Sequence, residues 1–265
     1  MNTYTHGHAE AVLRSHRWRT AANSAAYLLP HLHAGQRLLD VGSGPGTITG
    51  DLARLGGGVV GLEVTDEAAA ITRAELERRG VDNATVVVGD VHALEPERLG
   101  GPFDVVHAHQ VLQHVADPVG ALRQMLQGTR PGGLVAARDS DYGHFSWHPA
   151  SAVLDRWLEL YDAAARANGG EPNAGRMLLA WAHAAGATEV EASSSTWCFA
   201  TSEDRRWWGS MWADRITSTA LARQLVAEGR AGESDLAEVA EAWRSWADDP
   251  DGWFSVLHGE VLVRA

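Results

Sequence analysis

The hydrophobic positions of the chain form short apolar runs that alternate with longer segments of helical spacing. The run at residues 59–63 is followed by a stretch at 66–79 that lacks glycine and proline and has Thr65 in place to cap it. Such runs predict buried strands, and the segments between them predict helices. Alternating strands and helices form a parallel sheet covered on both faces. In this part of the chain, strands are predicted at residues 37–41, 59–63, 84–88, 103–107 and 134–139.

The pattern changes on either side of this alternating region. Before it, alanine and leucine recur at helical spacing over residues 21–29. We therefore expect an N-terminal helical segment at 1–35, a core at 36–145, and a C-terminal half at 146–265 that completes the sheet. In the C-terminal half, helices are predicted at residues 151–168, 173–185, 203–228 and 233–248, and strands at 188–200 and 254–263.

Composition narrows the classes of protein that fit. The chain has 265 residues, of which 45% are apolar, so it can bury a full core. Its 34 acidic and 22 basic residues give a net charge of -12, which argues against a nucleic-acid or anionic-membrane surface. Cys198 is the single cysteine, and the N-terminal residues lack the apolar core of a signal peptide. With no apolar run of membrane-spanning length, a cytoplasmic protein is expected.

A glycine-rich turn carries the first functional signal. Gly42, Gly44 and Gly46 follow the strand at 37–41, and Thr47 opens the next helix. Glycine admits positive φ, so a ligand can approach bare backbone at a strand's carboxyl end, where open α/β sheets bind their ligands. The nicotinamide fingerprint Gly-x-Gly-x-x-Gly needs a glycine where this chain has Thr47. No lysine follows the turn, which disfavours a nucleoside triphosphate.

Asp40 and the three glycines form the pattern Asp-x-Gly-x-Gly-x-Gly, which resembles motif I of the class I methyltransferases that use S-adenosylmethionine (SAM). The segments at 111–118 and 129–133 are similar to later segments of the small-molecule branch that includes the quinone-biosynthesis C-methyltransferases, also described as methyltransferase type 11-like. The resemblance covers residues 1–140. It implies a Rossmann-like α/β fold, with a seven-stranded, mostly parallel sheet, helices on both faces, an antiparallel last strand and helical insertions in the C-terminal half.

The resemblance and the spacing together place cofactor-binding residues at successive strand ends. Glu63 lies 17 residues after Gly46, close to the spacing of about 20 at which an acid meets ribose hydroxyls in nucleotide-binding folds. By resemblance, Asp90 and the next backbone N–H contact adenine, the residues after the fourth strand hold the methionine end, and the N-terminal segment covers the cofactor as a lid. The candidate cofactor-binding residues are Tyr4, Arg19, Asp40, Gly42, Gly44, Gly46, Thr47, Glu63, Val64, Asp90, Val91, His109, Gln110 and His114.

The acceptor side is predicted from the segment at 139–149, which leaves the fifth strand where a transferred methyl group would point. A base is needed only if the acceptor must lose a proton. His144 is the first candidate, because a histidine near its unperturbed pKa accepts a proton at neutral pH, and Asp139 and Asp141 are the next.

Aromatic residues are concentrated on the same side. Ten of the eleven tryptophans lie at or after Trp147. Tyr142, Trp147 and Trp208 are therefore candidate walls of a substrate pocket. No metal is expected, since His6 and His8 have no partnering cysteine or acid cluster.

These patterns predict an enzyme that moves a methyl group from SAM to an O, N or C atom of a small, aromatic or secondary-metabolite acceptor by in-line displacement, leaving S-adenosylhomocysteine (SAH). Neither nucleic acid nor a membrane is an expected partner, and a homodimer stays open. Three alternatives are kept, because a fold does not fix a function. They are an enzyme that retains the cofactor but catalyses cyclisation or rearrangement, a nicotinamide-dependent oxidoreductase, and a non-catalytic binding protein.

Overall fold

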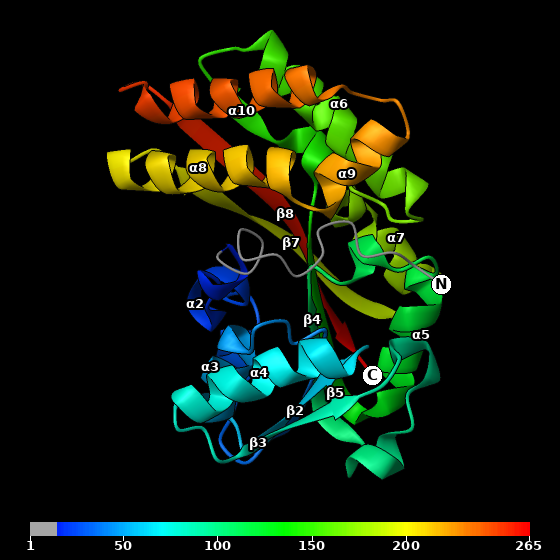
Figure 1. The fold of residues 1–265 in the computed structure, drawn as a ribbon. Helices are drawn as coiled ribbons and strands as arrows, with labels where there is room; N and C mark the ends of the chain where they lie inside the picture. The colour runs from blue at the N-terminus through cyan, green and yellow to red at the C-terminus, as the bar shows by residue number, and fades with distance from the viewer. Residues whose placement is uncertain (1–14) are drawn as a thin grey trace.

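The computed structural model describes residues 15–265, and Figure 1 shows a central sheet with a further layer of helices beyond one end. The elements through the fifth strand are α2 (Ala21–Ser24), η1 (Leu29–His31), β1 (Arg37–Val41), α3 (Thr47–Leu55), β2 (Gly58–Glu63), α4 (Asp66–Arg78), β3 (Ala84–Val88), η2 (Val91–Ala93), η3 (Pro96–Leu99), β4 (Phe103–His109), η4 (Leu112–His114), α5 (Pro118–Gly128) and β5 (Thr129–Ser140). They are followed by η5 (Tyr142–His144), β6 (Ser146–His148), α6 (Ala152–Ala167), α7 (Ala174–Ala184), β7 (Glu189–Phe199), α8 (Ser202–Ser218), α9 (Ala220–Ala227), α10 (Glu233–Asp248) and β8 (Trp253–Arg264).

The sheet has the order β3-β2-β1-β4-β5-β8-β6, and β7 also pairs with β8. The strands from β1 to β5 pair in parallel, whereas β8 runs antiparallel to β5, β6 and β7. This confirms the predicted Rossmann-like class. The sheet has eight strands rather than seven, because the three-residue β6, too short to give a periodic signal, pairs with the start of β8. The chain order reverses between β1 and β4, and open α/β sheets bind ligands at the carboxyl ends of strands at such a point.

Helices cover both faces of the parallel region. Figure 1 shows α3 and α4 on one side of the sheet and α5 and α7 on the other. On the first side, Leu52 of α3 packs with Leu38 of β1 in one hydrophobic cluster. On the second side, Met125 of α5 and Leu178 of α7 pack with Val106 of β4. Strands buried on both faces explain the continuous apolar runs in the sequence.

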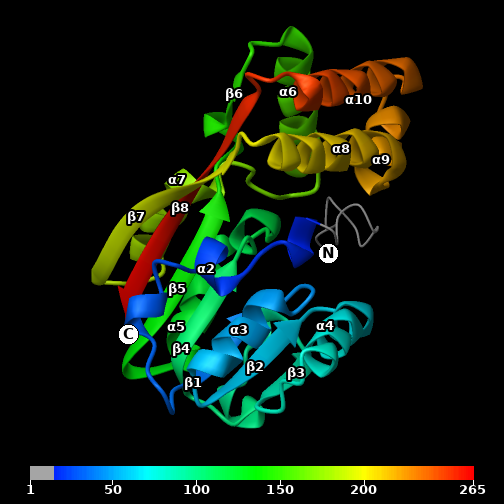
Figure 2. The same cartoon turned by 90° about the vertical axis from the view of Figure 1, so that its left-hand side faces the viewer.

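The helices α6, α8, α9 and α10 form the layer that we call the helical cap, which lies beyond the carboxyl end of β5 (Figure 2). Its core is aromatic. The ring centroid of Trp157 lies 4.6 Å from that of Trp212 and 4.9 Å from that of Trp243, and both pairs pack edge to face. Phe254 at the start of β8 belongs to the same cluster, so the last strand joins the cap to the sheet. The division of the chain at residues 35 and 145 stays a prediction. No helix of residues 15–265 is both long and apolar enough to cross a membrane.

The predicted helix at residues 21–29 is wrong beyond its first turn. In the structure α2 ends at Ser24. The indole N–H of Trp197 donates to the backbone carbonyl oxygen of Asn23 at 2.6 Å, which is the acceptor that the next helical turn would use. A contact with a strand far along the chain therefore ends this helix.

The predicted helix at residues 203–228 is divided into α8 and α9 at Thr219. The hydroxyls of Thr217, Ser218 and Thr219 each donate to the carbonyl oxygen four residues earlier, at 2.9, 2.6 and 2.8 Å. Such bonds compete with the backbone ladder and bend or end a helix. The other elements predicted for the C-terminal half are confirmed to within one residue at each end.

Candidate functional site

The glycine turn between β1 and α3 has the backbone that its sequence predicts. Gly42, Gly44 and Gly46 have positive φ angles of 67°, 55° and 86°. A Cβ atom on Gly42 would lie 2.5 Å from Cγ2 of Val111, so a larger residue cannot fit there without a shift. At Gly44 the nearest described atom beyond its chain neighbours would be 4.0 Å from a Cβ atom. The turn therefore presents open backbone at the carboxyl end of β1.

Glu63 ends β2 directly beside this turn. Its carboxylate accepts hydrogen bonds from the backbone N–H of Gly44 and, at 3.4 Å, from the hydroxyl of Ser43. Burial raises the pKa of Glu63 to about 7, against the lowering effect of these hydrogen bonds. The nearby charge with the largest effect on this pKa is that of Asp40, which raises it further. A buried carboxylate in these surroundings is stabilised in its charged form by further donors, and a pair of ribose hydroxyls would supply them.

Val64 and Asp90 continue the same edge of the sheet. Gly89 donates its N–H to the carbonyl oxygen of Glu63 at 2.8 Å, which brings the ends of β2 and β3 together. Val64 is 69% exposed, and the Asp90 side chain is 59% exposed, whereas Val91 is buried. An exposed apolar side chain beside an exposed carboxylate fits the ring face and the amino edge of a purine.

Asp40 and Thr47 lie on the inner side of the glycine turn. Asp40 is buried and is bonded by the hydroxyl of Thr49 at 2.6 Å and by Nδ1 of His107 at 2.8 Å. Thr47 donates to the backbone carbonyl oxygen of His16 at 3.4 Å. Asp40 thus links the end of β1 to α3 and β4, and Thr47 links the start of α3 to the segment before α2.

An aromatic pocket lies between the sheet and the helical cap. It is bounded by the carboxyl ends of β4 and β5, by the segment before α2, by β7 and β8, and by one face of α8. We call it the aromatic pocket, and its lining residues are Ser15, Trp18, Arg19, Gln110, Ser140, Tyr142, Phe145, Trp197, Trp207, Trp208, Trp212, Arg215 and Val256. Because Gln110 lines it and the next residue, Val111, packs on Gly42, the pocket adjoins the glycine turn.

Gln110 is fixed at this junction. Its φ is 53°, the single positive value among the non-glycine residues that the structure describes, and its N–H donates to the carbonyl oxygen of Arg138 at 2.7 Å. His258 donates from Nδ1 to the carbonyl oxygen of Val256 at 3.1 Å, so its Nε2 keeps a lone pair that accepts from the Gln110 amide at 2.9 Å. Backbone strain of this kind is common at functional sites.

Of the histidines predicted near the cofactor, His109 is buried and His114 is half-buried. Burial lowers the pKa of His109 well below its ordinary value, and Arg138 adds to this effect. Burial also lowers the pKa of His114 to about 3, and the charges of Arg19 and Arg215 lower it further. Neither imidazole therefore adds a positive charge to this region near neutral pH.

The three candidate bases have different surroundings. Arg176 donates to Asp141 and, at 2.7 Å, to Nδ1 of His144, whose side chain is 56% exposed and is not part of the pocket lining. Nδ1 of His144 also lies 3.2 Å from a carboxylate oxygen of Asp141, and in the tautomer that donates to this oxygen Nε2 keeps its lone pair. Asp139 is buried, its Oδ2 has no hydrogen-bond partner among the described residues, and burial raises its pKa to about 7. Neither Asp139 nor His144 is among the described residues that line the aromatic pocket, and the role of base stays a prediction for both.

The predicted pocket walls are divided between two places. Tyr142 and Trp208 line the aromatic pocket. Trp147 instead packs in the cap core, stacked on Phe254 with 5.8 Å between ring centroids. Arg19 lines the pocket, and its guanidinium lies 5.6 Å from the ring centre of Trp197. Tyr4 lies outside the described residues.

Sequence reasoning missed part of this pocket. Trp212 and Arg215 were not predicted, although they follow the predicted Trp208 at spacings of four and three residues, which places all three on one face of α8. That spacing was a readable signal. Trp18, Trp197 and the supporting His258 gave none, since each comes from a different part of the chain.

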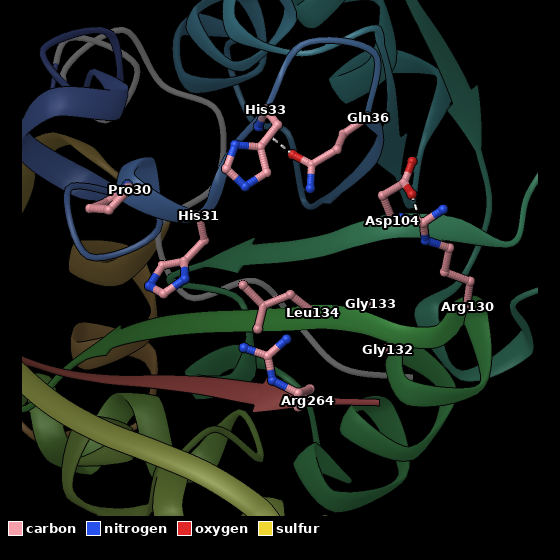
Figure 3. A pocket seen from close by; sticks show the side chains of 10 residues that line it. All are labelled: Pro30, His31, His33, Gln36, Asp104, Arg130, Gly132, Gly133, Leu134 and Arg264. Atoms are coloured by element: carbon pink, nitrogen blue, oxygen red, sulfur yellow. Dashed lines mark hydrogen bonds and ion pairs between the residues drawn. The ribbon is translucent and has the colours of Figure 1, made fainter.

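A second cavity, of about 300 Å³, lies at the opposite end of the sheet, where β1, β4 and β5 begin (Figure 3). The ion pair between Arg130 and Asp104, at 2.6 Å, lies on one side of it, and His31 lies on the other. Because the cavity is remote from the glycine turn, we assign it no part in cofactor binding. The described part of the chain holds no cluster of three or more His, Cys, Asp or Glu residues suited to a metal ion.

The fold and the glycine turn with Glu63 beside it define a Rossmann-like protein with a site for a nucleoside-containing cofactor. The family model for a methyltransferase domain matches residues 32–206, and the chain belongs to this family. It is a class I SAM-dependent methyltransferase.

Individual relatives agree with this assignment. An uncharacterised methyltransferase of Schizosaccharomyces pombe is 32% identical over 98% of this chain and 96% of its own. A ubiquinone biosynthesis O-methyltransferase of Ruegeria pomeroyi is 34% identical over 47% of this chain and 50% of its own. This quinone-biosynthesis relative is an O-methyltransferase, whereas the sequence resemblance was to C-methyltransferases. The solved YcgJ protein of Bacillus subtilis shares the fold, with a TM-score of 0.57, 16% identity, and coverage of 90% of this chain and 96% of its own.

Proposed function

We propose that this enzyme transfers the methyl group of SAM to an aromatic small molecule held in the aromatic pocket and releases SAH. The observation that carries the proposal is the junction at Gln110 and Val111, which gives the pocket and the glycine turn a common wall. Direct transfer needs the cofactor site and the acceptor site to adjoin, so that the methyl group and the acceptor atom can come into contact. The ubiquinone biosynthesis relative supports a hydroxyl oxygen of a small molecule as the acceptor atom.

The residues at the strand ends fit SAM. The open backbone of Gly44 admits the nucleoside, the buried carboxylate of Glu63 accepts the ribose hydroxyls, and Val64 and Asp90 receive the adenine ring and its amino group. His109 and Gln110 lie at the end of β4, where the methionine end would be held. When bound, SAM supplies a methyl group that is already activated on its sulfonium sulfur.

The chain's own contribution is to orient the acceptor and to exclude water. The aromatic side chains give the pocket flat, apolar walls, and Gln110, held by His258, gives it a fixed polar group. Orientation alone can lower a barrier by about 7–11 kcal/mol. Where an acceptor hydroxyl must lose its proton, Asp139 is the proposed base, because it precedes the lining residue Ser140 at the end of β5 and burial raises the pKa of its carboxyl to about 7.

Two measurements test this function. Calorimetric titration should show tight binding of SAH and none of reduced nicotinamide dinucleotide. Incubation with SAM and a panel of hydroxylated aromatic compounds should then give a product heavier by one methyl group, together with SAH. Failure to bind SAH would refute the cofactor assignment. Turnover of a substrate without mass gain or SAM consumption would instead identify a cyclising or rearranging enzyme.

A further inference from the structure

One edge of the sheet is a long strand with a single neighbour. Among the described residues, β7 pairs only with β8, in an unbroken register over its eleven residues. Figure 2 shows β7 as the outermost strand of the sheet. An edge strand offers unpaired N–H and C=O groups to another chain, and proteins protect such edges with charges, proline or bulges. We infer that β7 pairs antiparallel with β7 of a second copy of this chain, which forms a homodimer.

The opposite edge of the sheet is protected in ways that β7 is not. There β3 has five residues, and the guanidinium of Arg73 donates to the carbonyl oxygen of Val86 at 3.0 Å. In β7 the residues from 192 onward include neither a charged residue nor a proline, and the pairing with β8 has no bulge. The edge of β7 is therefore open to a further strand.

The surface around β7 is depleted of charge. Charged residues make up 21% of the chain, but residues 177–202, which span most of α7 and all of β7, contain only Glu189 and Glu191. Apolar side chains are exposed here, Met177 by 37% and Leu179 by 40%. The cores of protein interfaces are depleted of charged residues in the same way. On a chain of net charge -12, this surface neither attracts a basic partner nor repels a second copy.

One face of β7 is open as well as its edge. Val190 lies opposite Val263 of β8, and both pack in the hydrophobic cluster that includes α7. Every second residue of the strand after Val190 points to the same face. These residues are exposed and small, and they are Ala192, Ser194, Thr196 and Cys198. A strand of a second copy can therefore approach this face without displacing a large side chain.

Symmetry limits the register of the pair. Two antiparallel strands related by a twofold axis keep the same face of the sheet on the same side, so the axis passes through a residue position. An axis at Ser194, the middle of β7, pairs all eleven residues. Both acids, Glu189 and Glu191, then lie opposite aromatic residues of the second copy rather than opposite each other, where like charges would be unfavourable.

The mass of the protein in solution tests the dimer. Size-exclusion chromatography with light scattering, over a dilution series, should give twice the chain mass of 28.5 kDa at the highest concentrations. Ser194→Lys places two like charges opposite each other and should return the mass to that of one chain. Because Ser194 is exposed, this variant should keep the circular dichroism of the wild type. Ser245→Lys, at an exposed serine of α10, is the matched control and should leave the dimer intact.

A disulfide tests the register. With the axis at Ser194, residue 190 of one copy lies opposite Cys198 of the other. Val190→Cys should therefore give a covalent dimer on oxidation with copper phenanthroline, whereas the two positions of one strand are too far apart to bond. Glu189→Cys, whose side chain points to the other face, is the control. It should stay unlinked, as should the wild type.

A single-chain mass at every concentration would overturn the inference, as would a dimer that survives Ser194→Lys. Equal loss of the dimer in Ser245→Lys would remove β7 as its site. A dimer that Ser194→Lys dissociates but Val190→Cys does not link would overturn the register around Ser194. These measurements need neither SAM nor an acceptor, so their failure is distinct from a failure of the proposed function.

Discussion

Glu63 should make the binding of SAH depend on pH near neutrality. In the ligand-free protein burial raises its pKa to about 7, so the carboxyl is largely protonated one pH unit below that value. Ribose hydroxyls that donate to the carboxylate favour the ionised form and return the pKa toward the ordinary 4.5. Binding then releases a proton in the acidic range, and the affinity rises with pH until Glu63 is ionised in both states.

The size of this effect follows from the two pKa values. A pKa of about 7 in the free protein and 4.5 in the complex makes SAH bind about tenfold more weakly near pH 6 than near pH 8. Calorimetry across this range, in buffers that differ in ionisation enthalpy, measures both the affinity and the released proton. Glu63→Gln should bind SAH more weakly throughout and lose the pH dependence. Glu67→Gln, an exposed acid in the first turn of α4, is the matched control and should keep it.

A wild-type affinity that does not change over this range would show that Glu63 does not receive the ribose hydroxyls. The same conclusion would follow if Glu63→Gln kept the full pH dependence. In that case the proton belongs to another group, and Asp139 is the first to examine because burial also raises its pKa to about 7.

Three further predictions follow from the same geometry. Because the folded state holds the proton of Glu63 more tightly than the unfolded state, the stability of the ligand-free protein falls as pH rises from 4.5 to about 7. Glu63→Gln removes this penalty of up to about 3 kcal/mol and should therefore raise the Tm near pH 8. An unchanged Tm in thermal unfolding would contradict this prediction. Gly42→Ala should abolish SAH binding because its Cβ meets Val111, whereas Gly132→Ala, with a similar φ of 77° but open space around it, should lower stability and keep the affinity measured by calorimetry. Asp139→Asn should lower kcat and remove the inflection near pH 7 from the pH profile of kcat while SAH affinity is retained; an unchanged profile would remove Asp139 from the role of base.

The parallel half of the fold could be predicted because its signals are local. Each strand from β1 to β5 contains a short apolar run, and Thr65 caps α4 as expected, accepting from the N–H of Ala68. The failures had non-local or side-chain causes. The helix expected at 21–29 ends where Trp197, more than 170 positions later, takes a backbone carbonyl oxygen. The long helix of the cap breaks where three consecutive hydroxyls bond back to their own turn, which a hydrophobic pattern does not record.

The same distinction separates the two halves of the site. The proposed cofactor-binding residues follow one another along one stretch of the chain, because successive parallel strands end at the same edge of the sheet. Gly42, Glu63 and Asp90 each lie at or just after one of these strand ends. The aromatic pocket has no such order. Arg19 precedes α2, Gln110 follows β4, and Arg215 ends a helix of the cap, so their convergence depends on how the cap is placed on the sheet. The resemblance to a known family therefore predicts the cofactor, whereas the residues proposed to select the acceptor are brought together only in the folded chain.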